Sequence, residues 1–296
     1  MSKNKDTNTS KKVWKVILII ALLLFFAAAG FSAYYIYSVV KAEREYQELQ
    51  AKIAAQPTLE EVMEQDYTER EGDSPEIPSE LYAEDIEQEL IDLGVDVSNP
   101  IDFEELEGIN TDLYAWIRIP DTNIDYPIAQ HAEQADYYLH HNMYGQAQFS
   151  GSIYSEALNN KDFSDPVTIL YGHNMKNGSM FHDLHSFRDK EFFDEHPYVY
   201  VYTPEGTLVY QVVSAGVTDD KHIMYAYDFE DEEVFAEYLE DMQKTSLWGK
   251  YVREDVELDT DSRILIMSTC VGGKENLRYI VQAVRIYYGR EEEKQD

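Results

Sequence analysis

The sequence predicts a mostly β protein in which about eight strands form a closed barrel or a sandwich, preceded by a transmembrane helix and an acidic helical stalk. Three features carry this prediction. A charge-free apolar run lies near the N-terminus, an acidic segment with proline breakers follows it, and short apolar runs separated by turn residues fill the remainder. With 296 residues, the chain is long enough for one large domain or two small ones.

The apolar run covers residues 16–40, which contain no charged side chain. Since about 20 apolar residues at 1.5 Å per residue cross a bilayer, this run is long enough to span one. Five lysines precede it, and the positive-inside rule places residues 1–15 in the cytoplasm. We therefore expect a single-pass plasma-membrane protein whose remainder lies outside the cell. A cleaved signal peptide is the alternative, because residues 27–29 are alanines, but the apolar run continues well past them.

Residues 41–100 are expected to form the stalk. Residues 41–55 continue the helix of the anchor, and residues 56–100 are acidic and interrupted by prolines, so they should repel one another and extend. Apolar residues spaced over 80–93 suggest a short helix as the alternative to a solvated spacer there. Residues 291–296 form a charged tail.

Strand-like runs recur within a predicted barrel domain over residues 101–290. Turn residues separate several of them, and the turn at 204–206 joins a predicted hairpin over 198–213. The predicted strands are 113–119, 124–130, 151–154, 167–171, 198–202, 208–213, 264–267 and 279–288.

One amphipathic helix is predicted between these strands, over residues 228–244. Its apolar positions recur at helical spacing, and Asp228 or Asp231 is placed to cap its N-terminus. We expect this helix to cover one face of the barrel. Its apolar positions are Phe235, Tyr238, Leu239 and Met242.

Cys270 is the only cysteine in the sequence, and it ends the apolar run 263–270. A strand that finishes on a thiol places the sulfur at the rim of a sheet, where a reacting group can reach it. Outside the cytoplasm a lone cysteine cannot form an intrachain disulfide, so it is a reactive group, an intermolecular partner or a buried filler.

A nucleophilic thiol needs a partner at neutral pH, because the pKa of a free thiol is about 8.5. His173 is the best placed of eight histidines, since it follows the predicted strand 167–171 and one glycine. Its alternative role is that of a hydrogen-bonded loop histidine. Strand alternation places Arg278 on the apolar face of the last strand, where a guanidinium needs an anion or a carbonyl as partner. A surface ion pair is the alternative for Arg278.

Two other classes of function are less well supported. His173, His182 and His185 are a candidate metal site, but the intervening loop supplies no matching ligand pattern, and we expect no metal. No EF-hand loop is present, so any Ca²⁺ binding by the many carboxylates would be diffuse. A formal net charge of −33 excludes nucleic acid as a partner.

Taken together, these residues resemble the sortases, and the class B sortases in particular, over roughly residues 103–286. The order of the three candidate residues fits this family, whereas cysteine peptidases of the NlpC/P60 type place the cysteine before the histidine. One departure is that Ile266 and Met267 stand where the family motif usually has Thr and Leu. The motifs that carry the resemblance are Tyr171-Gly-His173-Asn-Met, Ser268-Thr-Cys270 and Arg278.

The resemblance implies an eight-stranded sortase-type β-barrel and a cysteine transpeptidase without a cofactor. Cys270 would attack a Thr peptide bond in the C-terminal sorting signal of a secreted protein, and an amine of a peptidoglycan precursor would resolve the thioester. His173 would be the general acid and base, and Arg278 would steady the substrate and the oxyanion. Ser268 and Thr269 would line the substrate site. A pilin-polymerising sortase and a non-catalytic sortase-like binding module remain the alternatives.

Overall fold

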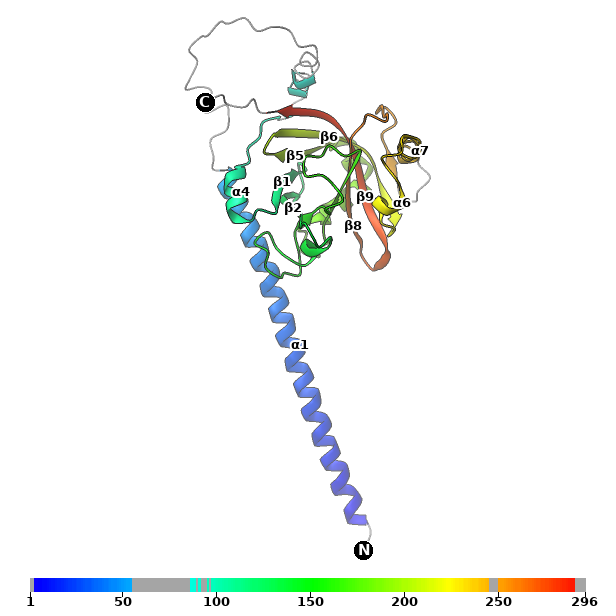
Figure 1. The fold of residues 1–296 in the computed structure, drawn as a ribbon. Helices are drawn as coiled ribbons and strands as arrows, with labels where there is room; N and C mark the ends of the chain where they lie inside the picture. Colours follow the sequence, from blue (N-terminus) through cyan, green and yellow to red (C-terminus); the bar gives the residue numbers. More distant parts are fainter. Residues whose placement is uncertain are drawn as a thin grey trace, which may run out of the picture. The chain divides into compact units, whose positions relative to one another are not determined.

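The computed structural model describes residues 3–54, 86–88, 90–91, 95, 97–244 and 250–290 (Figure 1). The chain divides into two compact units, Met1–Glu45 and Tyr46–Asp296. Of the acidic spacer expected over residues 56–100, residues 56–85, 89, 92–94 and 96 lie outside the described residues, as does the charged tail expected over 291–296.

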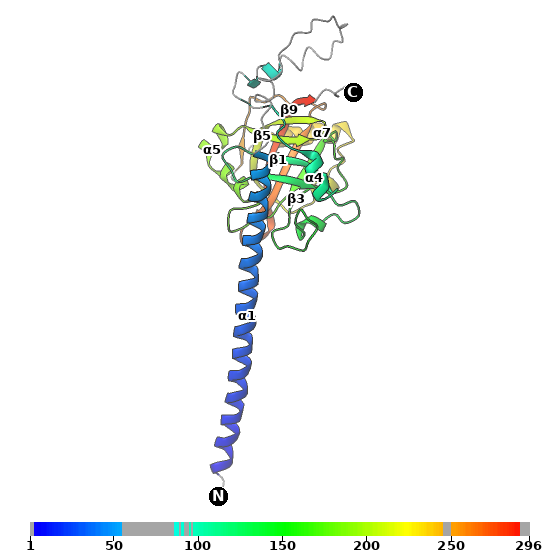
Figure 2. The same cartoon turned by 90° about the vertical axis from the view of Figure 1, so that its left-hand side faces the viewer.

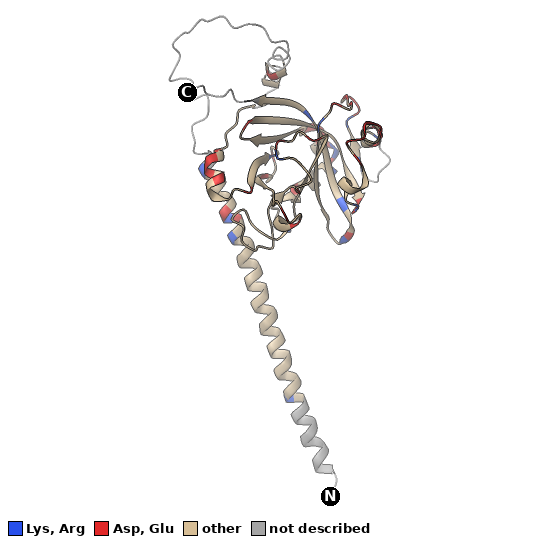
Figure 3. Ribbon diagram, viewed as in Figure 1, with Lys and Arg blue, Asp and Glu red and all other residues tan. Residues whose placement is uncertain are grey.

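Helix α1 spans Lys3–Ala54; its residues up to Glu45 belong to the first unit, and its residues from Tyr46 onward belong to the second. The part Trp14–Lys52 is long and apolar enough to cross a membrane, with a mean hydropathy of 2.7 in its most apolar stretch. Figure 3 shows the charge-free run as an uninterrupted tan section of this helix. These properties fit the expected membrane anchor.

The second unit is built around a sheet of nine strands in the order β5-β1-β2-β3-β4-β8-β9-β6-β7. A further pairing between β5 and β6 closes the first eight into a barrel, with β7 added to β6. The predicted mostly β fold and eight-stranded barrel are therefore confirmed. The strands are β1 (Leu113–Arg118), β2 (Asp125–Ala129), β3 (Ile153–Tyr154), β4 (Val167–Tyr171), β5 (Tyr198–Thr203), β6 (Gly206–Asp219), β7 (Tyr251–Val252), β8 (Ile264–Val271) and β9 (Lys274–Arg290).

Strands β6 and β9 are longer than the sequence predicts. The predicted strand 208–213 ends where small residues begin, but the antiparallel partner β9 continues the pairing as far as Asp219. Irregularities in register at Val209/Tyr210 and Val212/Ser214 bend the long pair. The resulting extension of β6 delivers the chain to the segment 219–223, which borders the pocket described below.

The helices of the barrel unit are short. Asp231 caps α7 by accepting hydrogen bonds from the backbone N–H groups of Glu233 and Val234, which confirms one of the two predicted caps. The apolar face of α7 is buried in a cluster with residues of β4, β8 and β9, as expected for a helix that covers the barrel. The helices are α4 (Phe103–Ile109), η1 (Tyr137–Leu139), η2 (Phe181–Arg188), α5 (Lys190–Glu195), α6 (Ile223–Ala226) and α7 (Glu232–Met242).

Parts of the segment expected to form the stalk belong to the barrel unit. The ring of Tyr46 packs edge to face on Tyr126 with centroids 5.0 Å apart. The last turns of α1 lie beside α4 and β1 (Figure 2), and Lys52 pairs with Glu105 there at 3.1 Å. Leu90 is buried, so this position is not part of a fully solvated spacer.

Candidate active site

Cys270 lies near the end of β8 and is exposed. Because side chains alternate along a strand, Ile266, Ser268 and Cys270 point to the same face. Ile266 is fully buried in the cluster under α7. That position therefore fills the core, which explains how isoleucine is accommodated where the family motif has threonine.

Arg278 lies directly opposite Cys270 in the antiparallel pair β8–β9. Residues opposite one another in such a pair have Cβ atoms about 4.5–5.5 Å apart on the same face. The guanidinium Nη1 donates to the backbone carbonyls of Glu275 at 2.8 Å and Leu277 at 3.1 Å. These bonds hold the head group near the start of β9, the strand that pairs with the Cys270 end of β8.

His173 follows β4 after one glycine, and this glycine is required by packing. A Cβ at Gly172 would lie 2.5 Å from Cδ1 of Ile153 and 2.8 Å from the ring of Phe181. The Gly172 N–H donates to the Ser268 carbonyl at 3.2 Å, and the Thr269 hydroxyl donates to the Gly172 carbonyl at 2.8 Å. The chain that carries His173 is thereby bonded to the end of β8.

The imidazole of His173 has a defined tautomer. Its Nε2 lies 2.9 Å from the carbonyl oxygen of Leu139, which can only accept, so Nε2 carries a proton. Nδ1 is then the unprotonated nitrogen of the neutral ring. Burial lowers the pKa of His173, the Leu139 carbonyl opposes this shift, and the nearby His140 lowers the pKa further.

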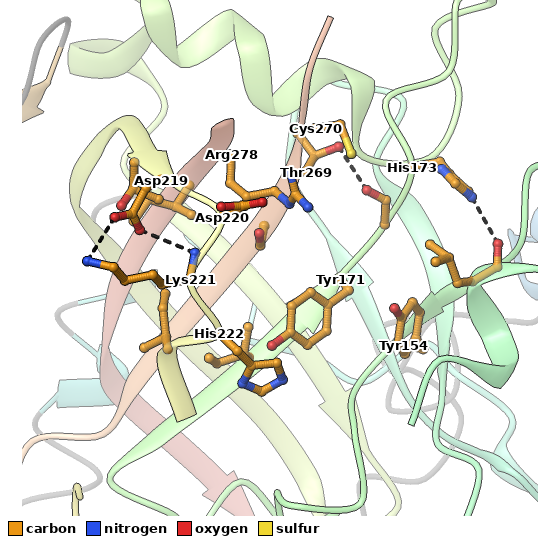
Figure 4. Close-up of a pocket in the computed structure, with 17 residues that line it drawn as sticks. Tyr154, Tyr171, His173, Asp219, Asp220, Lys221, His222, Thr269, Cys270 and Arg278 are labelled. Atoms are coloured by element: carbon orange, nitrogen blue, oxygen red, sulfur yellow. Dashed lines mark hydrogen bonds and ion pairs between the residues drawn. The ribbon is translucent and has the colours of Figure 1, made fainter. Parts of the chain in front are cut away.

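Cys270, His173 and Arg278 line one pocket with a volume of about 230 Å³. Figure 4 shows the His173 imidazole and Cys270 at one end of this pocket and Asp219, Lys221 and His222 at the other. Tyr154 and Tyr171 form part of the wall between the ends. The three residues predicted from distant positions in the sequence therefore meet in one place.

Ser268 and Thr269 also border the pocket. Both are buried, and the hydroxyl of Thr269 is engaged by the Gly172 carbonyl. Ser268 lies on the same face of β8 as Cys270, so of the two its side chain is the one directed to the same side as the thiol. The expectation that these two residues bind substrate stays a prediction.

The pocket wall opposite His173 contains His222, which pairs with the carboxylate of Glu156. His222 Nε2 lies 2.7 Å from Glu156 Oε2, and both side chains are mostly buried. The ring of His222 lies 6.2 Å from that of Tyr171 and 4.4 Å from that of Tyr225. This pair joins the loop after β3 to the segment after β6 and so fixes one end of the pocket.

A cluster of polar side chains contacts the backbone carbonyl of Cys270. The Asn174 side-chain amide donates to the Cys270 carbonyl oxygen at 2.9 Å, and His185 Nε2 lies 3.1 Å from the same oxygen. His182 Nδ1 lies 2.8 Å from the Asn174 amide oxygen. His182 and His185, considered above as metal ligands, thus lie beside Asn174, and His185 also contacts the backbone of Cys270.

Burial, together with the positive charge of Arg188, lowers the pKa of His185 to about 4 against the opposing effect of the Cys270 carbonyl. An unfolded histidine titrates near 6.5, so between pH 6.5 and 4 the unfolded chain binds more protons. The free energy of unfolding should therefore fall as the pH drops through this window, with a contribution from His185 of roughly 1–3 kcal/mol.

Urea unfolding of the wild type and of His185→Gln at pH 7.5 and pH 5 tests this expectation. Glutamine keeps a hydrogen-bonding group toward Cys270 and does not titrate. The loss of stability on acidification should be smaller in His185→Gln, while His173, whose pKa is also lowered, contributes equally to both proteins. Equal losses in the two proteins would show that His185 does not titrate as described.

Comparison with known proteins identifies the family. The sortase domain family matches residues 117–286 of the chain. The chain belongs to the sortase family. It is 36% identical over 185 residues to sortase B of Listeria monocytogenes, a match that covers 61% of this chain and 72% of that protein. Identity to sortase B of Staphylococcus aureus is 29% over 185 residues, covering 62% and 74%.

Solved sortase B structures agree with this assignment to class B. The Clostridium perfringens sortase B structure superposes with a TM-score of 0.56 at 32% identity, covering 62% of this chain and all of that one. A Staphylococcus aureus sortase B–substrate complex gives a TM-score of 0.57 at 26% identity, covering 71% and 95%. The class B assignment implies a cysteine transpeptidase.

Sequence reasoning missed the residues that surround the three central side chains. Asn174 directly follows His173, but a hydrogen bond from its amide to a carbonyl 96 positions later leaves no sequence pattern. The Glu156–His222 pair joins residues 66 positions apart, and only the strand order brings them together. Histidines near the end of a strand or on a short helix were the available signal, and the sequence alone offered only a poorly supported metal site as an interpretation of His182 and His185.

Proposed function

We propose that this class B sortase is a membrane-anchored transpeptidase that cleaves a Thr peptide bond in the C-terminal sorting signal of secreted proteins. It then transfers the new acyl end to an amine of a peptidoglycan precursor. One observation supports this proposal above the others: an exposed lone thiol shares a single pocket with an imidazole and a guanidinium. Residues 16–40 would anchor the protein in the plasma membrane, with residues 1–15 in the cytoplasm and the barrel outside the cell.

Cys270 is the nucleophile in this proposal. His173 Nδ1 takes the proton of the Cys270 thiol, and the sulfur attacks the carbonyl carbon of the Thr residue. The C–N bond then breaks, and Nδ1 passes this proton to the leaving amine. The acyl group remains on the sulfur as a thioester. An incoming amine then attacks the thioester carbon, gives a proton to His173, and releases Cys270 as the C–S bond breaks. No metal or cofactor takes part in either half of the reaction.

The proposal is tested with the full chain in detergent micelles. The substrate is a library of fluorogenic peptides with an Asn-Pro-x-Thr core, the signal type of the class B family, and triglycine amide serves as the acceptor. We expect release of the fragment that follows Thr and formation of a new amide to triglycine. Release of peptide at the same rate with no dependence on the amine, and no new amide, would indicate a hydrolase instead.

Arg278→Ala should lower kcat/KM of transfer by two to three orders of magnitude. Removal of one donor from an oxyanion site costs a factor of about 10² to 10³, and Arg278 lies opposite the nucleophile across the β8–β9 pair. Arg278→Lys keeps the charge but loses the planar fork, so it should recover only part of the activity. Arg263→Ala is the matched control, because this arginine lies at the other end of β8.

Steady-state rates with the best library peptide measure these effects. The role proposed for Arg278 would be contradicted if its alanine variant and the Arg263→Ala control retained the same kcat/KM as the wild type.

A further inference from the structure

The pocket that Cys270 shares with His173 also reaches a second group of residues. Its lining includes Tyr171, Arg278, Ile280 and the segment Asp219–Ile223, and near His173 it includes Leu139 and Tyr154. In Figure 4, Asp219, Lys221 and His222 lie on the side of the pocket opposite His173. We assign the acyl part of a sorting signal to the side of Asp219–Ile223, which leaves the surface next to His173 for the amine part. His173 exchanges a proton with both the leaving and the incoming amine, so both must use that surface.

An exposed aromatic side chain occupies this surface. Phe149 is 57% exposed, and its ring lies 6.0 Å from the His173 ring at an interplanar angle of 6°. His140 is exposed, with its ring 6.2 Å from His173. A ring that is held in place beside the proton-transferring group offers a contact surface, and its π face attracts a cation.

The segment that carries Phe149 is held by its own hydrogen bonds. The Gln148 N–H donates to the His140 carbonyl at 2.8 Å, and the Gln148 side-chain oxygen accepts from Asn142 at 2.9 Å. Gly151 has a φ of +58°, and a Cβ there would lie 2.5 Å from the carbonyl oxygens of Tyr138 and Leu139. Phe149 is thus placed on a loop that is tied to η1, the element whose Leu139 carbonyl fixes the His173 tautomer.

The charge of this region suits a cationic ligand. No lysine or arginine occurs between Arg118 and Lys161. Glu133 and Asp136 are exposed in the segment directly before η1, and Phe149 lies in the segment after it. Burial is the main cause that raises the pKa of Tyr154, and the negative charges of Glu156 and Asp136 add to it. The field of Asp136 therefore reaches a residue of the pocket, where it raises the local concentration of an ammonium group.

We propose that Phe149 and His140, together with the carboxylates of Glu133 and Asp136, form the docking surface for the acceptor, a peptide that presents a primary amine. This inference rests on the transpeptidase function proposed above. The ammonium docks, loses one proton to solvent, and attacks the thioester carbon with its lone pair. The C–N bond forms, the C–S bond breaks with its electrons on the Cys270 sulfur, and the second proton passes to His173 Nδ1.

The ratio of transfer to hydrolysis tests this surface with the full chain and one fixed sorting peptide. Triglycine amide is the acceptor, and the hydrolysed peptide formed in the same reaction is the internal reference. Phe149→Ala should raise KM for triglycine amide about five- to tenfold and lower the transfer-to-hydrolysis ratio at subsaturating acceptor. Phe149→Tyr, which keeps the ring, should remain within about twofold of the wild type.

Two further variants distinguish the contact made by the Phe149 ring from the effect of the two carboxylates. Leu158→Ala removes an exposed apolar side chain (47% exposed) that does not line the pocket, and it should change neither KM nor the ratio. The double variant Glu133→Gln/Asp136→Asn should raise the acceptor KM about threefold at 20 mM salt and by less at 500 mM, where exposed charges are screened.

The outcomes distinguish this inference from the proposed function. If the wild type releases no fragment from any library peptide, the transpeptidase function itself fails. If the wild type transfers normally while Phe149→Ala keeps the wild-type acceptor KM and transfer-to-hydrolysis ratio, the function stands and the docking surface is overturned.

Discussion

Cys270→Ala is expected to abolish both transfer to an amine and release of the fragment that follows Thr. The alanine side chain has no atom that can hold the acyl group, and the sequence contains no second cysteine to replace it. Both the formation of the thioester and its resolution need this sulfur, so both half-reactions should stop together. Fragment release and amide formation are measured by chromatography with the best library peptide.

Folding and labelling controls separate loss of chemistry from loss of structure. Cys270 is exposed, so its truncation should change the free energy of unfolding by less than about 0.5 kcal/mol. A small thiol-reactive reagent should modify the wild type once and leave Cys270→Ala unmodified, with transfer lost in proportion to labelling. Normal turnover by Cys270→Ala would end the account of this protein as a cysteine transpeptidase.

His173→Ala is expected to lower kcat/KM of transfer by a factor of about 10² to 10⁴, the range that general acid–base catalysis contributes. The imidazole shares the pocket with the thiol, and its Nε2–H bond to Leu139 leaves Nδ1 for proton exchange. His141→Ala is a suitable control, because this neighbouring histidine stacks on Tyr137 and does not line the pocket.

The pH dependence of the wild type provides a second measurement of the same role. Since burial lowers the pKa of His173, the acid limb of kcat/KM should fall below pH 6.5, the ordinary value for a histidine. A His173→Ala variant with kcat/KM within tenfold of the wild type, or a wild-type acid limb above pH 6.5, would contradict this role.

Local patterns predict the barrel well because its strands alternate and its turns contain recognisable residues. The lengths of β6 and β9 depend instead on each other, since Ser214, Ala215 and Gly216 adopt strand structure through pairing with β9. The cap and the buried face of α7 follow from residue type and spacing alone. Tyr46 and Leu90 were assigned to a stalk because their neighbours are charged, yet both are buried by contacts that a local pattern does not encode.

The candidate site, too, could be predicted from the sequence only in part. Cys270, His173 and Arg278 stand at strand ends and belong to recognisable motifs, so their convergence could be expected before the structure. The contacts of Asn174 and His185 with the Cys270 carbonyl could not be predicted, because any residue type supplies a backbone carbonyl, and such a hydrogen bond leaves no pattern in the sequence. Phe149 is an exposed aromatic residue in a loop, and only its stacking beside His173 gives it significance.

Intact-protein mass spectrometry tests the central chemical step most directly. The full chain is mixed with a reactive library peptide in the absence of an amine and quenched in acid within seconds. The account predicts an added mass equal to the acyl fragment ending in Thr, located on Cys270 by peptide mapping, and removed when triglycine amide is added before the quench. A fragment attached to any other residue, or continued product formation with no adduct on Cys270 under conditions that trap thioesters, would contradict it.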